Sequence, residues 1–204
     1  MESTTVKKSP PKRPPRAKQR TQLDRNDWIE AAIDVLSQHG LSGLRVEVLA
    51  KTCGVTKGSF YWHFKDRQDL LSAVLETWRA GRIKDIEKTT SAAQGLEQEQ
   101  LQHVIDVYGA SRNRKGMSIE LAVRDWAQRD LEAARIVEAV DLYRLECTQK
   151  LFAAAGLSEA DAKSRSLLLY ACVFGLSLMF YDHFDDNVTD LKARIVDRII
   201  SNQP

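Results

Sequence analysis

The sequence is poor in cysteine and has no long apolar run, and these two shortages exclude several classes of protein. Cys53, Cys147 and Cys172 are odd in number and far apart, so they predict neither a disulfide framework nor the paired ligands of a zinc site. No stretch reaches the ~18 uncharged apolar residues of a membrane span. The N-terminus lacks the order of charged, apolar and small residues that marks a secretion signal. We therefore expect a cytoplasmic protein with reduced cysteines and no membrane partner.

Proline is scarce outside the N-terminus, where Pro10, Pro11, Pro14 and Pro15 account for four of the five prolines in the chain. Residues 1–20 also have almost no apolar side chains to bury, which predicts a disordered arm. The arm is basic, and two interpretations of it stay open. It either adds phosphate or minor-groove contacts to a DNA interface, or it is a solvated tail.

Charge is distributed unevenly along the chain, although the net charge is only +2. Residues 1–25 carry eight Lys or Arg and a net charge of +6, residues 26–67 are neutral, and the remaining residues carry a net charge of −4. An excess of positive charge at one end is expected of a protein whose N-terminal part binds a polyanion.

Residues 44–64 have the pattern of two short helices joined by a tight turn. Val46, Leu49, Ala50 and Cys53 follow the i, i+3, i+4, i+7 spacing of one helical face. Gly54 follows them and tolerates the left-handed conformation in which many helices end. The first helix of the pair is therefore predicted to stop at this glycine.

The second helix of the pair has Thr56 as a suitable N-cap, and its Phe60 and Phe64 point to one side because they are four residues apart. The residues left on the other side are suited to DNA phosphates and base edges: Lys57, Ser59, Tyr61, Trp62 and His63. A plain helical hairpin that buried all of them would have almost no solvated face. We therefore interpret the segment as a helix-turn-helix whose second helix binds DNA.

Helices are also predicted on both sides of this segment. Asp24 is a suitable N-cap for a helix that ends at Gly40, and Asp66 for a helix that extends to about Thr90. At ~1.5 Å per residue the latter spans about 35 Å. It is therefore expected to connect a DNA-binding end at Arg67 with the C-terminal part of the chain.

The segment from Asp24 to Leu71 resembles the DNA-binding module of the TetR family of bacterial transcriptional regulators. The resemblance is carried by Trp28-Ile29-Glu30-Ala31-Ala32, Leu49-Ala50-Lys51, Gly54-Val55-Thr56-Lys57-Gly58-Ser59-Phe60-Tyr61 and His63-Phe64. Two positions depart from the family pattern. Arg45 stands where a small hydroxyl residue is more common, and Arg67 stands where lysine is more common, with a different phosphate-binding geometry.

The resemblance implies DNA contacts of two kinds. Lys57 and Ser59 are placed at base edges, where lysine is suited to the acceptors of guanine. Phosphate contacts are implied for five other residues: Arg45, Thr56, Tyr61, His63 and Arg67. Trp62 occupies a variable family position, where it packs on a sugar, contacts a thymine methyl group or only covers the backbone.

The C-terminal part is predicted to be helical throughout, with helices over residues 96–110, 117–128 and 130–155 and two more that start at Ser158 and Asn187. Residues 167–181 are apolar nearly all round, so a helix there must be buried on more than one side. We expect this helix and the last one to pair with their symmetry mates in a homodimer, rather than form the centre of a monomer, as the resemblance also implies. The predicted interface residues are Leu168, Cys172, Gly175, Met179, Ile195 and Ile199.

These patterns predict an all-α protein of about nine helices. The expected organisation is a basic arm (1–20), a three-helix helix-turn-helix DNA-binding domain (21–81, with the motif at about 45–64) and a helical effector-binding and dimerisation domain (82–204). The resemblance implies a repressor that binds a palindromic double-stranded operator as a homodimer, with recognition helices ~34–36 Å apart. A bacterial, cytoplasmic protein that associates with the nucleoid when bound to DNA is expected.

The resemblance further implies a pocket for a small-molecule effector that releases the protein from DNA. No Gly-rich phosphate loop is present, so the expected effector is apolar or aromatic rather than phosphorylated. Each candidate pocket residue has a core role as its alternative, since aromatic side chains are most often core residues. The candidates are Trp78, His103, Tyr108, Met117, Trp126, Tyr143, Tyr170 and Phe174.

Enzymatic and metal-binding functions are not expected. Glu99 and His103 have the i, i+4 spacing of two metal ligands, but no second pair accompanies them as a di-metal helical bundle requires. The acidic tract 182–186 is interpreted as a polar connection between helices. We therefore expect no metal, no cofactor and no catalytic residue. An effector-independent DNA-architectural protein that uses the basic arm is the alternative to a regulator.

Overall fold

A computed structural model describes residues 23–91, 95–109, 114–181 and 183–201, and the side chains of residues 105–109 and of Arg114 are left out of the description. Within these ranges the chain is entirely helical, with nine α-helices and no strand, which confirms the predicted fold class. The predicted basic arm lies outside the described residues. The helices are α1 (Arg25–His39), α2 (Val46–Thr52), α3 (Lys57–Phe60), α4 (Arg67–Thr90), α5 (Glu97–Gly109), α6 (Arg114–Ala127), α7 (Leu131–Ala154), α8 (Glu159–Leu178) and α9 (Val188–Ile200), with a 3₁₀ turn η1 (Leu41–Gly43) after α1.

Most helices begin where a side chain can accept a hydrogen bond from the exposed backbone of the first turn. Asp24, Asp66, Asp130, Ser158 and Asn187 each accept such a bond from the residue three positions later. A side chain of this kind satisfies one of the donors that a helix start leaves unpaired, which stabilises the helix by ~1 kcal/mol. The predicted starts at these residues are therefore confirmed.

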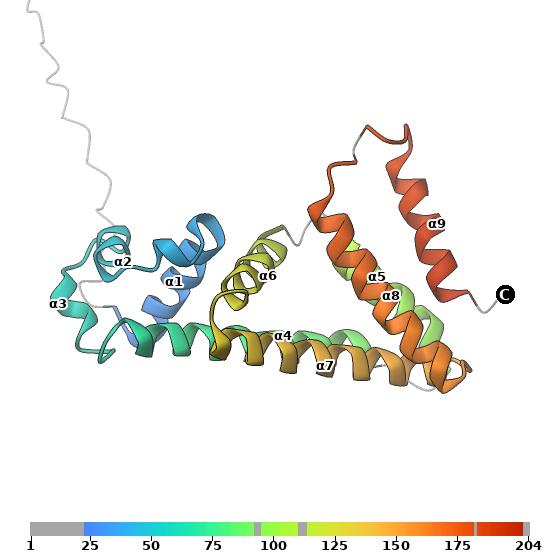
Figure 1. The fold of residues 1–204 in the computed structure, drawn as a ribbon, viewed down its shortest axis with the longest axis horizontal. Coiled ribbons are helices and arrows are strands. Elements are labelled where there is room, and N and C mark those ends of the chain that lie inside the picture. The colour runs from blue at the N-terminus through green and yellow to red at the C-terminus, as the bar shows by residue number, and fades with distance from the viewer. Residues whose placement is uncertain (1–22, 92–94, 110–113, 182, 202–204) are drawn as a thin grey trace, which may run out of the picture.

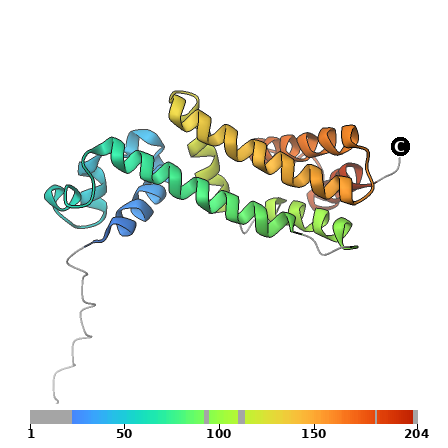
Figure 2. The same cartoon turned by 90° about the horizontal axis from the view of Figure 1, so that it is seen from below.

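The molecule is elongated, and two long helices run along most of its length. Figure 1 shows α1, α2 and α3 at one end, α5, α8 and α9 at the other, and α6 between them. Helix α4 runs from the first group to the second, and α7 lies beside α4 from the position of α6 onward (Figure 2). Helix α6 packs on α1, and the Lys115 ammonium lies 2.7 Å from the Asp34 carboxylate across that contact. Helices α4 and α6 therefore both connect the α1–α3 group to the rest of the fold.

The apolar residues form two core clusters. The first joins α1, α2 and α3 to α4, α6 and α7, and includes Trp28, Phe60, Trp78 and Trp126. The second joins α5, α7, α8 and α9. The first cluster and α4 both continue past residue 81, where the domain boundary is predicted. The division into 21–81 and 82–204 stays a prediction, and the two parts share a core.

Within the described residues, each helix is either too short or too polar to cross a membrane.

Candidate nucleic-acid interface

The helix-turn-helix geometry depends on one glycine at the corner between α2 and α3. Gly54 has a φ of 68°, in the left-handed region that glycine adopts without a steric cost. The backbone then reverses, and the Val55 N–H donates to the Ala50 carbonyl at 3.0 Å. Val55 packs against the first core cluster and fixes the angle between the two helices.

The second helix is shorter than a recognition helix normally is. Only Lys57–Phe60 is α-helical, and turns continue to His63, with the Phe64 N–H donating to the Phe60 carbonyl at 3.1 Å. Thr56 occupies the predicted N-cap position, but its side chain makes no capping hydrogen bond. The expectation that the Thr56 side chain caps this helix is therefore wrong. The segment depends on tertiary packing instead.

That packing comes from an aromatic cluster beneath the segment. Phe60 is fully buried, its ring edge-on to Trp28 at 5.4 Å between centroids and stacked on Phe64 at 5.1 Å. On the outer side Trp62 is 83% exposed and Tyr61 is 53% exposed. Burial of Phe60 and Phe64 while Tyr61 and Trp62 between them face water is the division that the sequence pattern predicts.

The other predicted contact residues are distributed around the same surface. Arg45, Thr56 and Lys57 are exposed, whereas Ser59 and His63 are partly buried. Arg45 precedes α2 as its N-cap residue and makes no capping bond with its side chain. DNA contacts by these residues stay a prediction.

Arg25 and Asp69 hold the end of this segment in place, and neither was predicted to do so. The Arg25 guanidinium donates to the His63 carbonyl at 2.5 Å and to the Asp69 carboxylate at 3.1 Å, and lies 4.2 Å from the centre of the Phe64 ring. The Lys65 backbone N–H and then Arg25 hold the pKa of Asp69 below its ordinary value. These contacts span 38 and 44 residues of sequence, so local spacing carries no signal of them.

Arg67 uses its guanidinium inside the protein. Its Nε donates to the Leu44 carbonyl at 2.5 Å and its Nη2 to the Leu41 carbonyl at 3.3 Å. These bonds connect the start of α4 to the η1 turn that leads into α2. The predicted phosphate contact of Arg67 stays a prediction, and the residue has a structural role besides.

Lys57, which is predicted to contact a base edge, is paired with a carboxylate for which the sequence predicted no role. Its ammonium lies 2.5 Å from Oε1 of Glu47 on α2, and both side chains remain mostly exposed. The hydrogen bond between them raises the pKa of Lys57 and is the largest cause of the lowered pKa of Glu47. Both groups are therefore charged across the physiological range, and Lys57 approaches DNA with its counter-charge beside it.

The predicted pocket residues that the structure describes fall in two core clusters, and their role in an effector pocket stays a prediction. Trp78, Trp126 and Tyr143 belong to or pack against the first core cluster, and Met117, Tyr170 and Phe174 belong to or pack against the second. His103 is exposed, and the side chain of Tyr108 lies outside the description. Tyr143 donates to Glu87 on α4, which raises the pKa of Tyr143 to about 12.

A group of buried and partly buried charges contacts the aromatic rings of the second set. Oε1 of Glu120 on α6 accepts from Arg124 at 2.8 Å and from Arg144 on α7 at 3.2 Å, and both guanidiniums also contact Asp141. Burial alone would lower the pKa of Arg124, but Asp141 and Glu120 raise it above its ordinary value. The Arg124 guanidinium lies 4.1 Å from the centre of the Phe174 ring. This charge cluster therefore connects α6, α7 and α8.

The predicted dimer residues on α8 and at its C-cap form an apolar stripe that the chain itself covers only in part. Leu168 and Met179 are exposed, and Cys172, Gly175 and Ile195 are partly buried. Exposed leucines at 167 and 178 extend the stripe along the helix. Ile199 departs from the prediction because it is buried in the second core cluster of its own chain, so it can add little to a contact with a second subunit.

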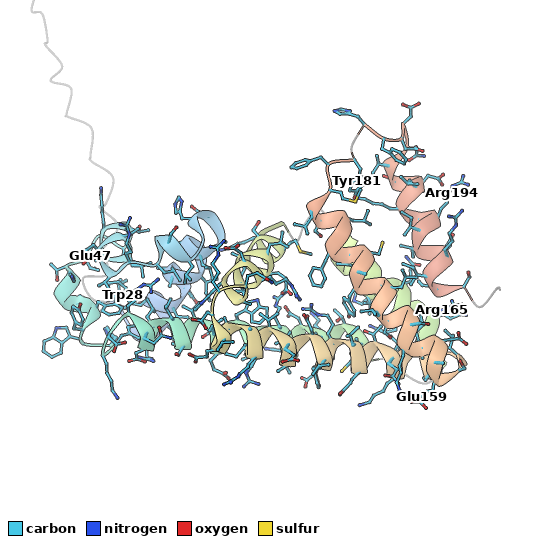
Figure 3. The ribbon with its side chains drawn as sticks, in the orientation of Figure 1. Trp28, Glu47, Glu159, Arg165, Tyr181 and Arg194 are labelled. Carbon is cyan, nitrogen blue, oxygen red and sulfur yellow. The ribbon has the colours of Figure 1, made fainter. Side chains whose placement is uncertain are left out.

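Among the described residues, no three His, Cys, Asp or Glu side chains are grouped as a metal ion would require. An open hollow of about 540 Å³ lies after the end of α8 and is lined by Met179, Phe180, Tyr181, His183 and Phe184. Figure 3 shows Tyr181 near the end of α8, far from α3.

Comparison with known proteins agrees with this geometry. The model of the family described as "Bacterial regulatory proteins, tetR family" matches residues 29–74. The chain is 31% identical over 199 residues to the HTH-type transcriptional regulator AcrR of Shigella flexneri, an alignment that covers 90% of this chain and 89% of the relative. It is 40% identical over 60 residues to the class A tetracycline repressor protein from transposon 1721 of Escherichia coli, covering 29% of this chain and 28% of that protein. A transcriptional regulator from Rhodococcus sp. Rha1 shares the fold with a TM-score of 0.69 at 19% identity, over 87% of this chain and 94% of that one.

Proposed function

This chain belongs to the TetR family of bacterial transcriptional regulators, and from that premise we propose that it is a repressor. It binds a palindromic operator as a homodimer and leaves the operator when a small molecule binds the C-terminal helices. The observation that carries the proposal is the surface of residues 56–63, where Lys57, Tyr61 and Trp62 are exposed and Phe60 is buried. An exposed ammonium together with two exposed aromatic rings is suited to a partner that offers phosphates, sugars and base edges.

Selection from a pool of random DNA duplexes tests the proposal directly. The protein should enrich one inverted repeat, and footprinting should show protection of both halves on one face of the duplex. Half-sites separated by one helical turn are expected because two-fold-related recognition helices enter successive major grooves. Broad protection of AT-rich DNA, with no enriched sequence, would instead support the architectural alternative, which the relatives of this chain do not favour.

Replacing Lys57 with alanine should relax the sequence preference at one pair of symmetry-related positions. A lysine that donates to guanine O6 and N7 discriminates against the wrong base by ~1–3 kcal/mol, so the loss should be confined to those positions. Competition binding with single-base operator variants measures it. An equal loss of affinity for every sequence would make Lys57 a phosphate contact.

The dimer is proposed to form across α8 and α9. Helix α8 buries one apolar side in its own chain and leaves leucines at 167, 168 and 178 exposed. A second copy related by a two-fold axis covers the same stripe on both subunits. Arg194 and Arg198 lie on the polar side of α9, which is exposed to water.

Replacing Leu168 with aspartate should weaken dimerisation roughly 100-fold, which corresponds to ~2.7 kcal/mol. Two carboxylates would then have to leave water in each dimer without a partner. Sedimentation velocity over a range of concentrations measures the change. Leu142, which is equally exposed but lies on α7, is the matched control, and its aspartate variant should dimerise like the parent. Equal behaviour of the two variants would exclude α8 from the interface.

The effector is proposed to act through α4. This helix contacts α1 and the α7 helix, and Ser72 and Tyr143 connect α4 and α7 by hydrogen bonds to Glu132 and Glu87. An apolar or aromatic molecule that separates the helices around Phe174 would therefore move α4 and change the spacing of the two recognition helices. Such a molecule must bind the DNA-incompetent form more tightly, since only that difference shifts the equilibrium.

A further inference from the structure

The pairing of Glu47 with Lys57 places a negative and a positive group at one point of the proposed DNA-binding surface. Glu47 is the second residue of α2, and Lys57 is the first residue of α3, on the other side of the Gly54 turn. Their charged atoms are 2.5 Å apart, and the Lys57 and Glu47 side chains are 51% and 63% exposed. Figure 3 shows Glu47 at the α2–α3 end of the molecule.

Both groups keep hydrogen-bonding capacity after they have paired. An ammonium has three N–H donors, and a carboxylate accepts at two oxygens with about four lone-pair positions. One bond between Lys57 and Glu47 therefore leaves Lys57 free to donate and Glu47 free to accept. The pair as a whole presents a donor and an acceptor side by side.

The edge of a G·C pair complements this arrangement best. In the major groove a G·C pair presents the O6 and N7 acceptors of guanine next to the N4 amino donor of cytosine. An A·T pair also presents an acceptor beside a donor, at N7 and N6 of adenine, but its purine offers the ammonium one acceptor where guanine offers two. A lysine ammonium opposite guanine O6 and N7 brings the paired carboxylate opposite the cytosine amino group.

We propose, as an extension of the DNA-binding function above, that Glu47 is a specificity-determining residue and that Glu47 and Lys57 read one G·C pair together. Lys57 donates to the guanine and Glu47 accepts from the cytosine of the same pair. The contact between Glu47 and Lys57 persists in the complex and fixes which of the two bases each residue reaches.

The negative charge of Glu47 has a second consequence at other sequences. Non-specific binding comes from attraction to phosphates, and a carboxylate at the surface opposes it. Where no amino group lies opposite Glu47 to donate to it, its carboxylate faces hydrogen-bond acceptors of the base edge, and the two repel each other. Glu47 therefore lowers the affinity for non-operator DNA and increases the ratio between specific and non-specific binding.

The experiment is the duplex selection repeated with the full-length Glu47→Ala, Glu47→Gln and Lys57→Ala variants. In the parent selection one pair of symmetric positions should be G·C, and both alanine variants should lose the preference at those same positions. The Glu47→Ala variant should also bind a non-operator duplex several-fold more tightly, and its specificity ratio should drop about tenfold, as expected for one lost base contact. The glutamine variant keeps an acceptor oxygen, so it should retain part of the cytosine preference while its non-specific affinity increases like that of the alanine variant.

Glu159 provides the matched control, because it forms an exposed pair with Lys163 at 2.7 Å on α8, at the opposite end of the molecule (Figure 3). Its alanine variant should leave both affinities unchanged. An unchanged preference in the Glu47→Ala variant, or loss at positions other than those that Lys57→Ala affects, would overturn the proposal while the regulator function stands. A parent protein that enriches no sequence would overturn the DNA-binding function itself.

Discussion

Replacing Glu120 with alanine should lower the free energy of unfolding by about 3–5 kcal/mol, because it leaves a buried cation without its main partner. The Arg144 side chain is 2% exposed, and both of its terminal nitrogens donate to Glu120. Asp141 would remain as a carboxylate partner of Arg144, at 3.2 Å, and it is already shared with Arg124. Urea unfolding at a fixed protein concentration measures the change, since the stability of a dimer depends on concentration.

A double replacement separates the cost of an unpaired charge from the cost of lost packing. The Glu120→Leu, Arg144→Met variant removes both charges together and fills the space with apolar atoms, while Arg124 and Asp141 keep their own ion pair. Such exchanges of buried ion pairs are often neutral or stabilising. Here Oε2 of Glu120 is buried without a hydrogen-bond partner, so the native arrangement already includes one unfavourable group. The double variant should therefore be within ~1.5 kcal/mol of the parent.

The contrast with a surface pair makes this prediction specific. Glu76 and Arg79 are 2.6 Å apart on α4 and both are exposed, and exposed pairs contribute about 0–1 kcal/mol. The Glu76→Ala variant should accordingly unfold almost like the parent. If Glu120→Ala also costs less than ~1 kcal/mol, the Glu120–Arg144 contact is not the buried bridge that connects α6 and α7.

The local features of this fold were predictable from the sequence, and the contacts across helices were not. The helix starts at Asp24, Asp66 and Asp130 follow from side chains that bond the backbone three residues later. That interaction needs no tertiary structure, so spacing alone reveals it. The α3 helix is the exception, because its four residues depend on Trp28 from α1 rather than on a cap.

The sequence pattern predicted which residues of the candidate site are exposed, but it did not predict which residues they contact within the protein. The aromatic pattern indicated that Tyr61 and Trp62 would be exposed above Phe60. The inward bonds of Arg67 to Leu41 and Leu44, and the pairing of Lys57 with Glu47, connect residues 10 to 26 positions apart. A long cationic side chain reaches many possible partners within its length, and only the angle between helices selects among them. The sequence contains no direct signal of that angle.

Replacing Phe60 with alanine should destabilise the DNA-binding end by about 3–5 kcal/mol, because a buried aromatic ring is replaced by a cavity. The Phe60 ring contacts Trp28, Tyr61 and Phe64 and is fully buried. With only four residues in α3 and no side-chain cap, little else holds the segment in its conformation. We therefore expect operator binding to be lost.

The helices that form the second core cluster share no residue with this aromatic group, so dimerisation of the Phe60→Ala variant should persist. Sedimentation together with unfolding followed by tryptophan fluorescence separates the two effects, since Trp28 reports on the aromatic group itself.

Trp62 supplies the control for this experiment because it is an aromatic residue two positions away that is 83% exposed. Its alanine variant removes a ring of similar size without making a cavity, so its free energy of unfolding should stay within ~0.5 kcal/mol of the parent. Operator affinity should decrease in both variants, but only Phe60→Ala should lose stability as well. A Phe60→Ala protein that unfolds like the parent and still binds the operator would show that the buried ring does not position residues 57–63. The exposed surface would then need another support, and the Arg25 contacts to His63, Phe64 and Asp69 are the next group to test.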